Sequence, residues 1–280
     1  MILTPKQLAE RSRIYVGSCH DAIERMAPSS VSLVVTSPPY DGRRKYKGKW
    51  SIDLVRLGQQ LYRVVTEGGV AAVVIQDSRF GGGMRTGTSI RMACAWMDHG
   101  WRLFDQLVYR RHGIPGRFET CFRGDHEHIF VFCKGDRVKT IDKSSLAVPS
   151  KSSGEVCRAG SLGPDGFNPI VKKIRRMGET KCRGTVWDYR NSVVEANATK
   201  FKHPATFPDR LAEDLVRCFS APGDLVLDPF LGSGTTAVVA AKLGRRFVGC
   251  EIAPEYVEIA KSRLHAESPI DPKVLPIEKV

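Results

Sequence analysis

The stretch DLVLDPFLGSGTTAVVAAKLGRRFVGCEI, residues 224–252, decides the fold. A short apolar run ends at Asp228, a turn with two glycines follows, and a helical segment starts at Thr235. The next apolar run ends at Glu251. A buried strand, a tight turn, a helix and a second strand in this order predict a unit that binds its ligand beyond the carboxyl ends of the strands.

The residues of this turn suit a ligand that contains a ribose. Gly232 and Gly234 allow the backbone to approach the ligand closely, and Glu251 can accept hydrogen bonds from both ribose hydroxyls. Gly232, Gly234 and Ala237 also fit the dinucleotide pattern G-x-G-x-x-A, so an NAD-dependent oxidoreductase is an alternative. Asp228 argues against it, because a carboxylate repels a pyrophosphate and suits the cationic amino acid portion of S-adenosylmethionine.

The pattern alternates strand and helix over most of the chain, which predicts an α/β fold with a mostly parallel sheet covered on both faces. The expected strands are 13–16, 31–36, 70–75, 103–109, 129–133, 225–227 and 247–250, and the expected helices are 21–26, 51–66, 89–98, 208–219, 235–243 and 254–264. Glu67-Gly68-Gly69 is expected to end the helix over 51–66 before the next strand.

The periodicity fades between Lys134 and Arg183, where Gly, Ser, Pro and Lys are frequent. Twelve basic and five acidic residues give this segment +7 of the chain's net charge of +13. A structureless stretch of this length in a compact domain is typically functional or disordered. We therefore expect one domain over 1–133 and 184–280, with a DNA-facing insert over 134–183; an ordinary solvated loop is the alternative.

Composition narrows the class of protein. The 280 residues have a net charge of +13 and an isoelectric point near 9.5, which favours a polyanionic partner such as nucleic acid. No apolar stretch is long enough to span a bilayer, residues 1–17 lack a signal-peptide pattern, and the eight scattered cysteines form no C-x-x-C pair. These observations predict a cytoplasmic protein without a membrane partner.

A cluster of potential metal ligands, Cys121, His126, His128 and Cys133, has an ordinary structural explanation. The segment DHEHIFVFC alternates like a strand, and its spacing matches no common zinc pattern. We expect no metal site.

The predicted strand 31–36 runs into Ser37-Pro38-Pro39-Tyr40. Two successive prolines hold such a turn extended and rigid. Taken alone, an ordinary Pro-Pro turn explains it.

Four motifs occur together: TSPPY at 36–40, HPATFP at 203–208, LDPFLGSGTT at 227–236 and VGCEI at 248–252. With them the chain resembles the amino-methylating DNA methyltransferases of the permuted, or beta, class, in which the catalytic motif precedes the cofactor motif. The resemblance implies a Rossmann-like, circularly permuted methyltransferase sheet, S-adenosylmethionine as cofactor and double-stranded DNA as substrate. A homodimer is a further expectation, because relatives are often dimers.

The resemblance also implies site residues. The catalytic residues would be Ser37, Pro38, Pro39 and Tyr40, and the cofactor residues would be Ser18, His203, Phe207, Asp228, Pro229, Phe230, Gly232, Ser233, Gly234, Thr235, Glu251 and Ile252. One departure weakens this assignment: relatives usually carry an acid after the glycine at Gly17, and here that position is Ser18.

The chemistry of the turn fits amine methylation. An exocyclic amine of a base is a poor nucleophile. Ser37 Oγ and the Pro38 carbonyl can accept hydrogen bonds from its two N–H groups and so aim its lone pair at the methyl group. Tyr40 can stack on a flipped base. Ring-carbon methylation of cytosine uses a cysteine, usually after a proline, and the chain has no Pro-Cys.

The product is therefore N6-methyladenine or N4-methylcytosine; Ser37 and the HPATFP form favour cytosine, but both bases stay open. Candidate phosphate contacts are Arg43, Arg44 and Lys45 in the stretch DGRRKYKGKW, and Lys172, Lys173, Arg175 and Arg176 in the insert. A non-enzymatic DNA-binding module is the remaining alternative, since it would not require the Ser37–Tyr40 turn.

Overall fold

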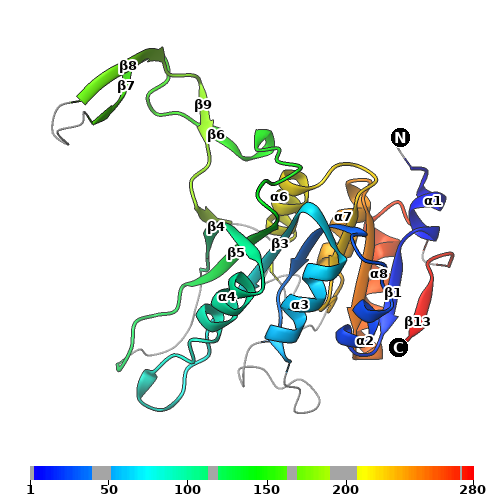
Figure 1. Ribbon diagram of the computed structural model, residues 1–280. Helices are drawn as coiled ribbons and strands as arrows, with labels where there is room; N and C mark the ends of the chain where they lie inside the picture. The colour runs from blue at the N-terminus through cyan, green and yellow to red at the C-terminus, as the bar shows by residue number, and fades with distance from the viewer. Residues whose placement is uncertain (1–2, 40–51, 113–118, 163–168, 190–206, 272) are drawn as a thin grey trace. The chain divides into compact units, whose positions relative to one another are not determined.

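The computed structural model describes residues 3–39, 52–112, 119–162, 169–189, 207–271 and 273–280 (Figure 1). The chain divides into two compact units. The first comprises Met1–Asp142 with Thr185–Val280, and the second is Lys143–Gly184. Among the described residues, no helix is long and apolar enough to cross a membrane.

The first unit is built on one sheet in the order β10-β4-β5-β3-β2-β11-β12-β1-β13. Its strands are β1 Arg13–Val16, β2 Val31–Thr36, β3 Val65–Ile75, β4 Trp101–Arg110, β5 His126–Lys134, β10 Val186–Asp188, β11 Leu225–Asp228, β12 Arg246–Glu251 and β13 Ile277–Lys279. Among these described strands, only β5 runs antiparallel to its neighbours, β3 and β4. The predicted mostly parallel sheet is confirmed.

Helices cover both faces of this sheet, as Figure 1 shows. The helices α2 Cys19–Glu24, α3 Leu54–Val64 and α4 Thr88–Asp98 pack side by side on one face. The helices α6 Asp209–Phe219, α7 Thr235–Lys242 and α8 Pro254–Glu267 form the row on the other, and α1 Pro5–Glu10 lies near the chain start. This is the expected Rossmann-like α/β arrangement.

The helix expected over 51–66 was too long at both ends. Asp53 caps α3, because its Oδ1 accepts hydrogen bonds from the amides of Val55 at 3.0 Å and Arg56 at 2.9 Å. The helix ends at Val64, and β3 begins at the next residue. The expected break at Glu67-Gly68-Gly69 was wrong: these residues lie inside β3, where the register with β2 shifts between Val31 and Leu33.

Short elements escaped the sequence analysis because they depend on partners elsewhere in the chain. The helix α1 is held by a capping box, in which Thr4 Oγ1 accepts from the Gln7 amide. The three-residue strands β10 and β13 exist by pairing with β4 and β1.

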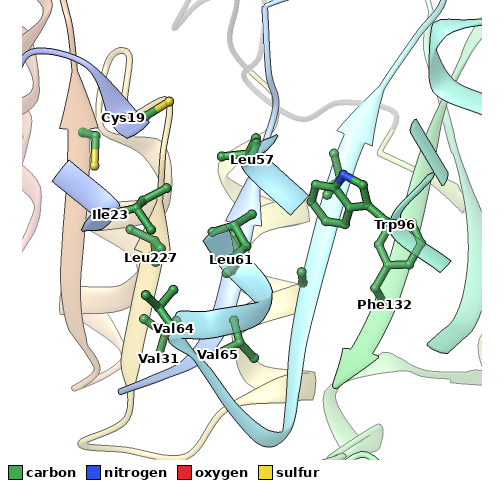
Figure 2. Packing of buried hydrophobic residues seen from close by; sticks show 14 of the residues in the cluster. Cys19, Ile23, Val31, Leu57, Leu61, Val64, Val65, Trp96, Phe132 and Leu227 are labelled. Atoms are coloured by element: carbon green, nitrogen blue, oxygen red, sulfur yellow. The ribbon is translucent and has the colours of Figure 1, made fainter. Parts of the chain in front are cut away.

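The face under α2, α3 and α4 holds a continuous apolar core (Figure 2). Leu57, Leu61 and Val64 of α3 are buried in it. Beside them lies an aromatic group in which the rings of Trp96 and Trp101 stack at 5.7 Å. Both indoles donate to backbone carbonyls of α3, Trp96 to Leu54 at 2.8 Å and Trp101 to Gly58 at 3.0 Å.

The second unit is a pair of short antiparallel ladders. The strands β6 Ala147–Pro149 and β9 Thr180–Cys182 pair, and so do β7 Val156–Leu162 and β8 Pro169–Arg176. The unit begins at Lys143 rather than at Lys134, where the sequence pattern fades. The intervening residues stay with the first unit, since the Lys139 amide donates to Gly68 O at 2.9 Å and the Asp142 amide to Cys218 O at 2.8 Å.

Gly58→Ala is expected to destabilise the protein. A Cβ at this buried helical position would lie 2.7 Å from Trp96 Cε2, so α3 must move away from the indole. Overpacking of this kind costs about 1–3 kcal/mol, which outweighs the ~1 kcal/mol that alanine normally adds to a helix. Chemical denaturation measures the change, with Gly81→Ala as the control, because nothing lies within 4 Å of a Cβ there. An increased stability of Gly58→Ala would contradict the close packing.

Candidate active site

The two predicted motif turns leave neighbouring strands at the same edge of the sheet. The parallel pair β2 and β11 places Leu33 beside Val226 and Val34 beside Leu227. Thr36 and Asp228, which end these strands, therefore adjoin, and Thr36 Oγ1 donates to Asp228 Oδ1 at 2.8 Å. The chain order reverses between β2 and β11, and ligands of open α/β sheets bind at such a switch point.

The glycine loop between β11 and α7 is tightly constrained. Gly232 and Gly234 have φ of 52° and 84°, values that favour glycine. A Cβ at Gly234 would lie 2.9 Å from Cβ of Ala260, so α8 leaves no space for a side chain there. Thr236 Oγ1 donates to Val35 O at 3.2 Å, which ties the start of α7 to the strand that carries the Pro-Pro turn.

Glu251 is oriented by backbone amides at the end of β12. Its Oε2 accepts from the Gly232 amide at 2.8 Å and its Oε1 from the Ala253 amide at 2.9 Å. Each oxygen keeps further acceptor capacity, which fits a pair of ribose hydroxyls. Burial raises the pKa of this carboxyl.

Asp228 is a buried carboxylate, and its hydrogen bonds offset only part of the cost of burying its charge. Burial raises the pKa of Asp228 to about 6, against the opposing effect of its hydrogen bonds from Thr36 and the Phe230 amide. A cation placed beside Asp228 would favour the ionised form. The site therefore fits a ligand with an ammonium group at Asp228 and a ribose at Glu251.

The other expected site residues near Asp228 and Glu251 differ in their exposure. In the Pro-Pro turn, Pro38 is buried, and Ser37 and Pro39 are partly exposed. Ser18 begins α2 without a capping bond from its side chain, and the preceding Gly17 amide donates to Glu251 O at 2.9 Å, which brings Ser18 to the Glu251 end of the site. Ile252 is 42% exposed beside it.

The remaining cofactor residues lie on the loop and at α6. Pro229, Gly232, Ser233, Gly234 and Thr235 are buried, whereas Phe230 is partly buried against the core. Phe207 is partly buried just before α6. Expected residues outside the described part of the chain are Tyr40, Arg43, Arg44, Lys45 and His203. Lys172, Lys173, Arg175 and Arg176 belong to β8 of the second unit, and the Arg176 side chain is exposed.

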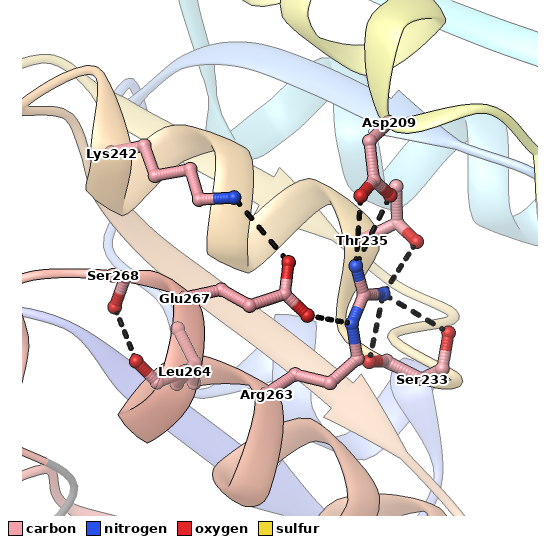
Figure 3. A network of polar contacts seen from close by, with 8 residues as sticks. All are labelled: Asp209, Ser233, Thr235, Lys242, Arg263, Leu264, Glu267 and Ser268. Atoms are coloured by element: carbon pink, nitrogen blue, oxygen red, sulfur yellow. Dashed lines mark hydrogen bonds and ion pairs between the residues drawn. The ribbon is translucent and has the colours of Figure 1, made fainter. Parts of the chain in front are cut away.

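Sequence reasoning missed Arg263, a buried arginine of α8 that holds the glycine loop from behind (Figure 3). Its guanidinium donates to Thr235 Oγ1 at 3.0 Å and to both carboxylate oxygens of Asp209 at 3.0 and 3.1 Å. Its Nε donates to Glu267 Oε1 at 3.0 Å. The signal was an arginine among buried Val257, Ala260 and Leu264, at helical spacing.

The fold and this site define a Rossmann-like α/β enzyme whose glycine loop and Pro-Pro turn lie at one edge of the sheet. The chain matches the DNA methylase family model for N6- and N4-methyltransferases over residues 31–262. It belongs to this family and is a DNA methyltransferase of the N6-adenine/N4-cytosine type. The predicted family is confirmed, and the oxidoreductase and non-enzymatic alternatives are rejected.

Curated relatives support this membership over nearly full length. The chain is 36% identical over 244 residues to the orphan methyltransferase M.BamHII of Bacillus amyloliquefaciens, covering 86% of this chain and 91% of that protein. It is 32% identical over 279 residues to the type II methyltransferase M.BglII of Bacillus subtilis, covering 94% and 71% of the two chains.

Solved structures agree with the fold. The protein TTHA0409 of Thermus thermophilus, solved in complex with S-adenosyl-L-methionine, aligns with a TM-score of 0.62 at 25% identity, over 96% of this chain and 99% of that one. The cytosine-N4-specific PvuII DNA methyltransferase aligns with a TM-score of 0.66 at 20% identity, over 95% of each chain.

Asp228→Asn is expected to stabilise the protein at neutral pH and to change little near pH 4. The folded-state pKa of about 6 exceeds the ordinary 3.8, so the folded protein holds a proton that the unfolded chain releases. Stability of the wild type therefore falls as pH rises from about 4 through about 6, by on the order of 2–3 kcal/mol. Denaturation of both proteins at pH 4, 6 and 8 measures this, and a stability difference independent of pH would contradict it.

Arg263→Met is expected to destabilise the protein and to weaken binding of S-adenosylmethionine. Breaking a buried ion pair typically costs about 3–5 kcal/mol, and the glycine loop loses its support at Thr235. Calorimetry below the melting temperature measures the affinity, and Arg263→Lys should retain part of it. Lys261→Met on the same helix is the control, because its contact with Glu258 is an exposed pair. Equal donor affinity in Arg263→Met and Lys261→Met would refute the positioning role.

Proposed function

We propose that the protein methylates, at a specific sequence in double-stranded DNA, the exocyclic amine of a base that leaves the helix. The observation that carries the proposal is the bond between Thr36 and Asp228, which joins the Ser37-Pro38-Pro39 turn to the donor loop. An acceptor pair for the amine and a site for the methyl donor thus adjoin across one pair of strands.

The methyl donor is S-adenosylmethionine, which when bound supplies a methyl group activated by a sulfonium. Asp228 holds the donor's ammonium group, and the cation favours the ionised form of a carboxyl whose pKa burial raises to about 6. Glu251 accepts from the ribose, since both of its oxygens are already oriented by amides. Gly232–Gly234 let the backbone approach the donor without side chains.

The Pro-Pro turn acts on the target amine. Ser37 Oγ and Pro38 O accept hydrogen bonds from the two N–H groups of the amine. These bonds draw the nitrogen out of conjugation with the ring and aim its lone pair at the methyl group. The rigid turn fixes these acceptors before the substrate arrives, so most of the gain comes from positioning. Tyr40 stacks on the extruded base. Ser37 and the HPATFP motif favour cytosine N4 over adenine N6.

The basic segments hold the DNA. The second unit acts in target recognition, with Lys172, Lys173, Arg175 and Arg176 of β8 at phosphates, and Arg43, Arg44 and Lys45 hold the backbone beside the extruded base. The seven cysteines whose side chains the structure describes are free thiols, in keeping with a cytoplasmic enzyme. Sedimentation of the purified protein tests the expected homodimer.

Ser37→Ala is expected to lower the rate of methyl transfer by about 10- to 100-fold, because one acceptor of the amine is lost in the transition state. DNA affinity should change little, which is the signature of an interaction made only during reaction. Single-turnover kinetics and anisotropy with labelled duplex measure the two quantities.

Mass spectrometry of the digested DNA identifies the product, with N4-methylcytosine or N6-methyladenine expected; the motif forms favour the first of the two. Ser32→Ala on the same strand is the control, because this residue precedes the motif. A full transfer rate in Ser37→Ala would sink the proposed role of Ser37, and 5-methylcytosine as product would sink the proposed function.

A further inference from the structure

The turn after β3 stands at the edge that carries the active site. The strand β3 is parallel to β2, with Thr36 beside Val73, so the residues after Ile75 follow the same edge as Ser37. The strand β4 also ends at this edge, and the antiparallel β5 begins there, with Arg110 beside His126. Segments 76–87 and 119–125 therefore lie on the side of the Pro-Pro turn that faces away from the donor loop.

These two segments form one ordered projection. Residues 79–85 make a hairpin, closed by an antiparallel bridge between Arg79 and Arg85 and a hydrogen bond of 2.9 Å from the Phe80 amide to Met84 O. We call this segment the arginine hairpin. Arg79 fastens it to the second segment by donating to Phe122 O at 2.9 Å. Gln76 binds Gly124 O and His126 O beneath.

The tip of the projection is apolar and exposed. Phe80 is 60% exposed and Met84 62%, at the two ends of the glycine turn Gly81–Gly83, and Phe122 beside them is 93% exposed. The segment is nevertheless well anchored, because Asp77 below it accepts from both the amide and the hydroxyl of Ser89. An ordered support that presents large apolar side chains to solvent indicates a contact surface.

The charge around this tip selects the partner. Residues 78–91 contain three arginines, Arg79, Arg85 and Arg91, and no acid. The described contacts of these guanidinium groups are to backbone carbonyls, which leave the positive charge uncompensated. The neighbouring segment 119–125 adds Arg123 together with Glu119 and Asp125, and Asp77 is buried below the hairpin. Residues 76–91 and 119–125 thus contain four arginines and three acids, a net charge of +1.

We propose that the arginine hairpin is a second DNA-contacting element, whose Phe80 and Met84 wedge against the bases beside the extruded target while Arg85 and Arg91 contact phosphates. Proteins that distort duplex DNA use phenylalanine and methionine in this manner. The inference rests on the proposed function, since it needs duplex DNA at the Pro-Pro turn. It adds a DNA contact that neither the second unit nor Arg43–Lys45 supplies.

A second copy of the chain is the weaker occupant. A two-fold contact brings the same patch of both copies together, so three arginines would face three arginines with no acid of 78–91 between them. DNA is a polyanion and would be attracted to the same arginines.

The test compares Phe80→Ala/Met84→Ala with a matched control, Ile141→Ala/Ile277→Ala. Ile141 and Ile277 are also exposed, at 44% and 37%, and neither lies in the projection. The probe is a labelled duplex carrying the sequence that methylation mapping of expressing cells identifies, with 2-aminopurine at the target base. Anisotropy gives the affinity, and 2-aminopurine fluorescence gives the extent of extrusion.

The hairpin variant should bind DNA about 5- to 100-fold more weakly and show reduced 2-aminopurine fluorescence, as expected for the loss of base contacts. Its S-adenosylmethionine affinity and melting temperature should match those of the control. Arg85→Gln/Arg91→Gln should lower the slope of log affinity against log salt by about one to two.

The other outcomes would overturn the hairpin proposal alone or together with the proposed function. DNA affinity and extrusion equal to the control would overturn the hairpin proposal while leaving methylation intact. Conversion of a dimer to a monomer with full DNA affinity would assign the tip to a second copy and also overturn it. A wild-type protein that neither bound this duplex nor methylated the same duplex with its natural target base would overturn the proposed function, and the hairpin proposal with it.

Discussion

The hydrogen bond from Thr36 to Asp228 is the contact on which the active site depends. It joins residues 192 positions apart, at the ends of two parallel strands, and it is buried. Because Thr36 directly precedes Ser37 and Asp228 opens the glycine loop, this one contact sets the distance between the proposed amine acceptors and the proposed site of the methyl donor. Thr236 strengthens the same junction from the helix side through Val35 O.

This junction carries an energetic cost that a ligand can relieve. Asp228 and Glu251 are two carboxyls with raised pKa values at adjoining strand ends, and burial is the main cause for both. Nearby Arg263 does not neutralise them, because its guanidinium is occupied by Asp209, Glu267 and Thr235. The site therefore keeps its negative charge for a cationic ligand, while Arg263 stabilises the loop that shapes it.

The sequence predicted well those helices and strands whose signal lies in their own residues, and missed those that depend on pairing with distant parts of the chain. Strands 13–16 and 31–36 match the structure at both ends, because apolar segments of this length are too short for a helix. The end of α3 was misjudged because Gly68 and Gly69 suggested a break, yet β3 runs through them, since Val65 before them and Val70 after them both pair with β2. The ladders of the second unit were missed, since their polar sequences lack periodicity and are defined only by pairing.

The site residues expected from sequence are limited in the same way. Motifs predict roles for Ser37, Asp228 and Glu251, because the residues next to each of them in the chain form the motif. Arg263 and the arginine hairpin have no such signature: the first acts through Asp209, 54 positions away, and the second through backbone carbonyls of segment 119–125. Such contacts arise from the crossing of distant elements, which periodicity cannot report.

The sheet topology explains why charge divides as it does along the functional edge. Every parallel strand delivers its carboxyl end to that edge, and the antiparallel β5 delivers its first residue there. On one side of the β2–β11 junction lie Asp228 and Glu251, and on the other lie Arg79, Arg85 and Arg110 together with Asp77, Asp125 and Asp188. Among these residues the first side carries acids alone, which favours a cationic ligand, and the second carries charges of both signs. The Pro-Pro turn follows β2, so it stands where the two sides adjoin.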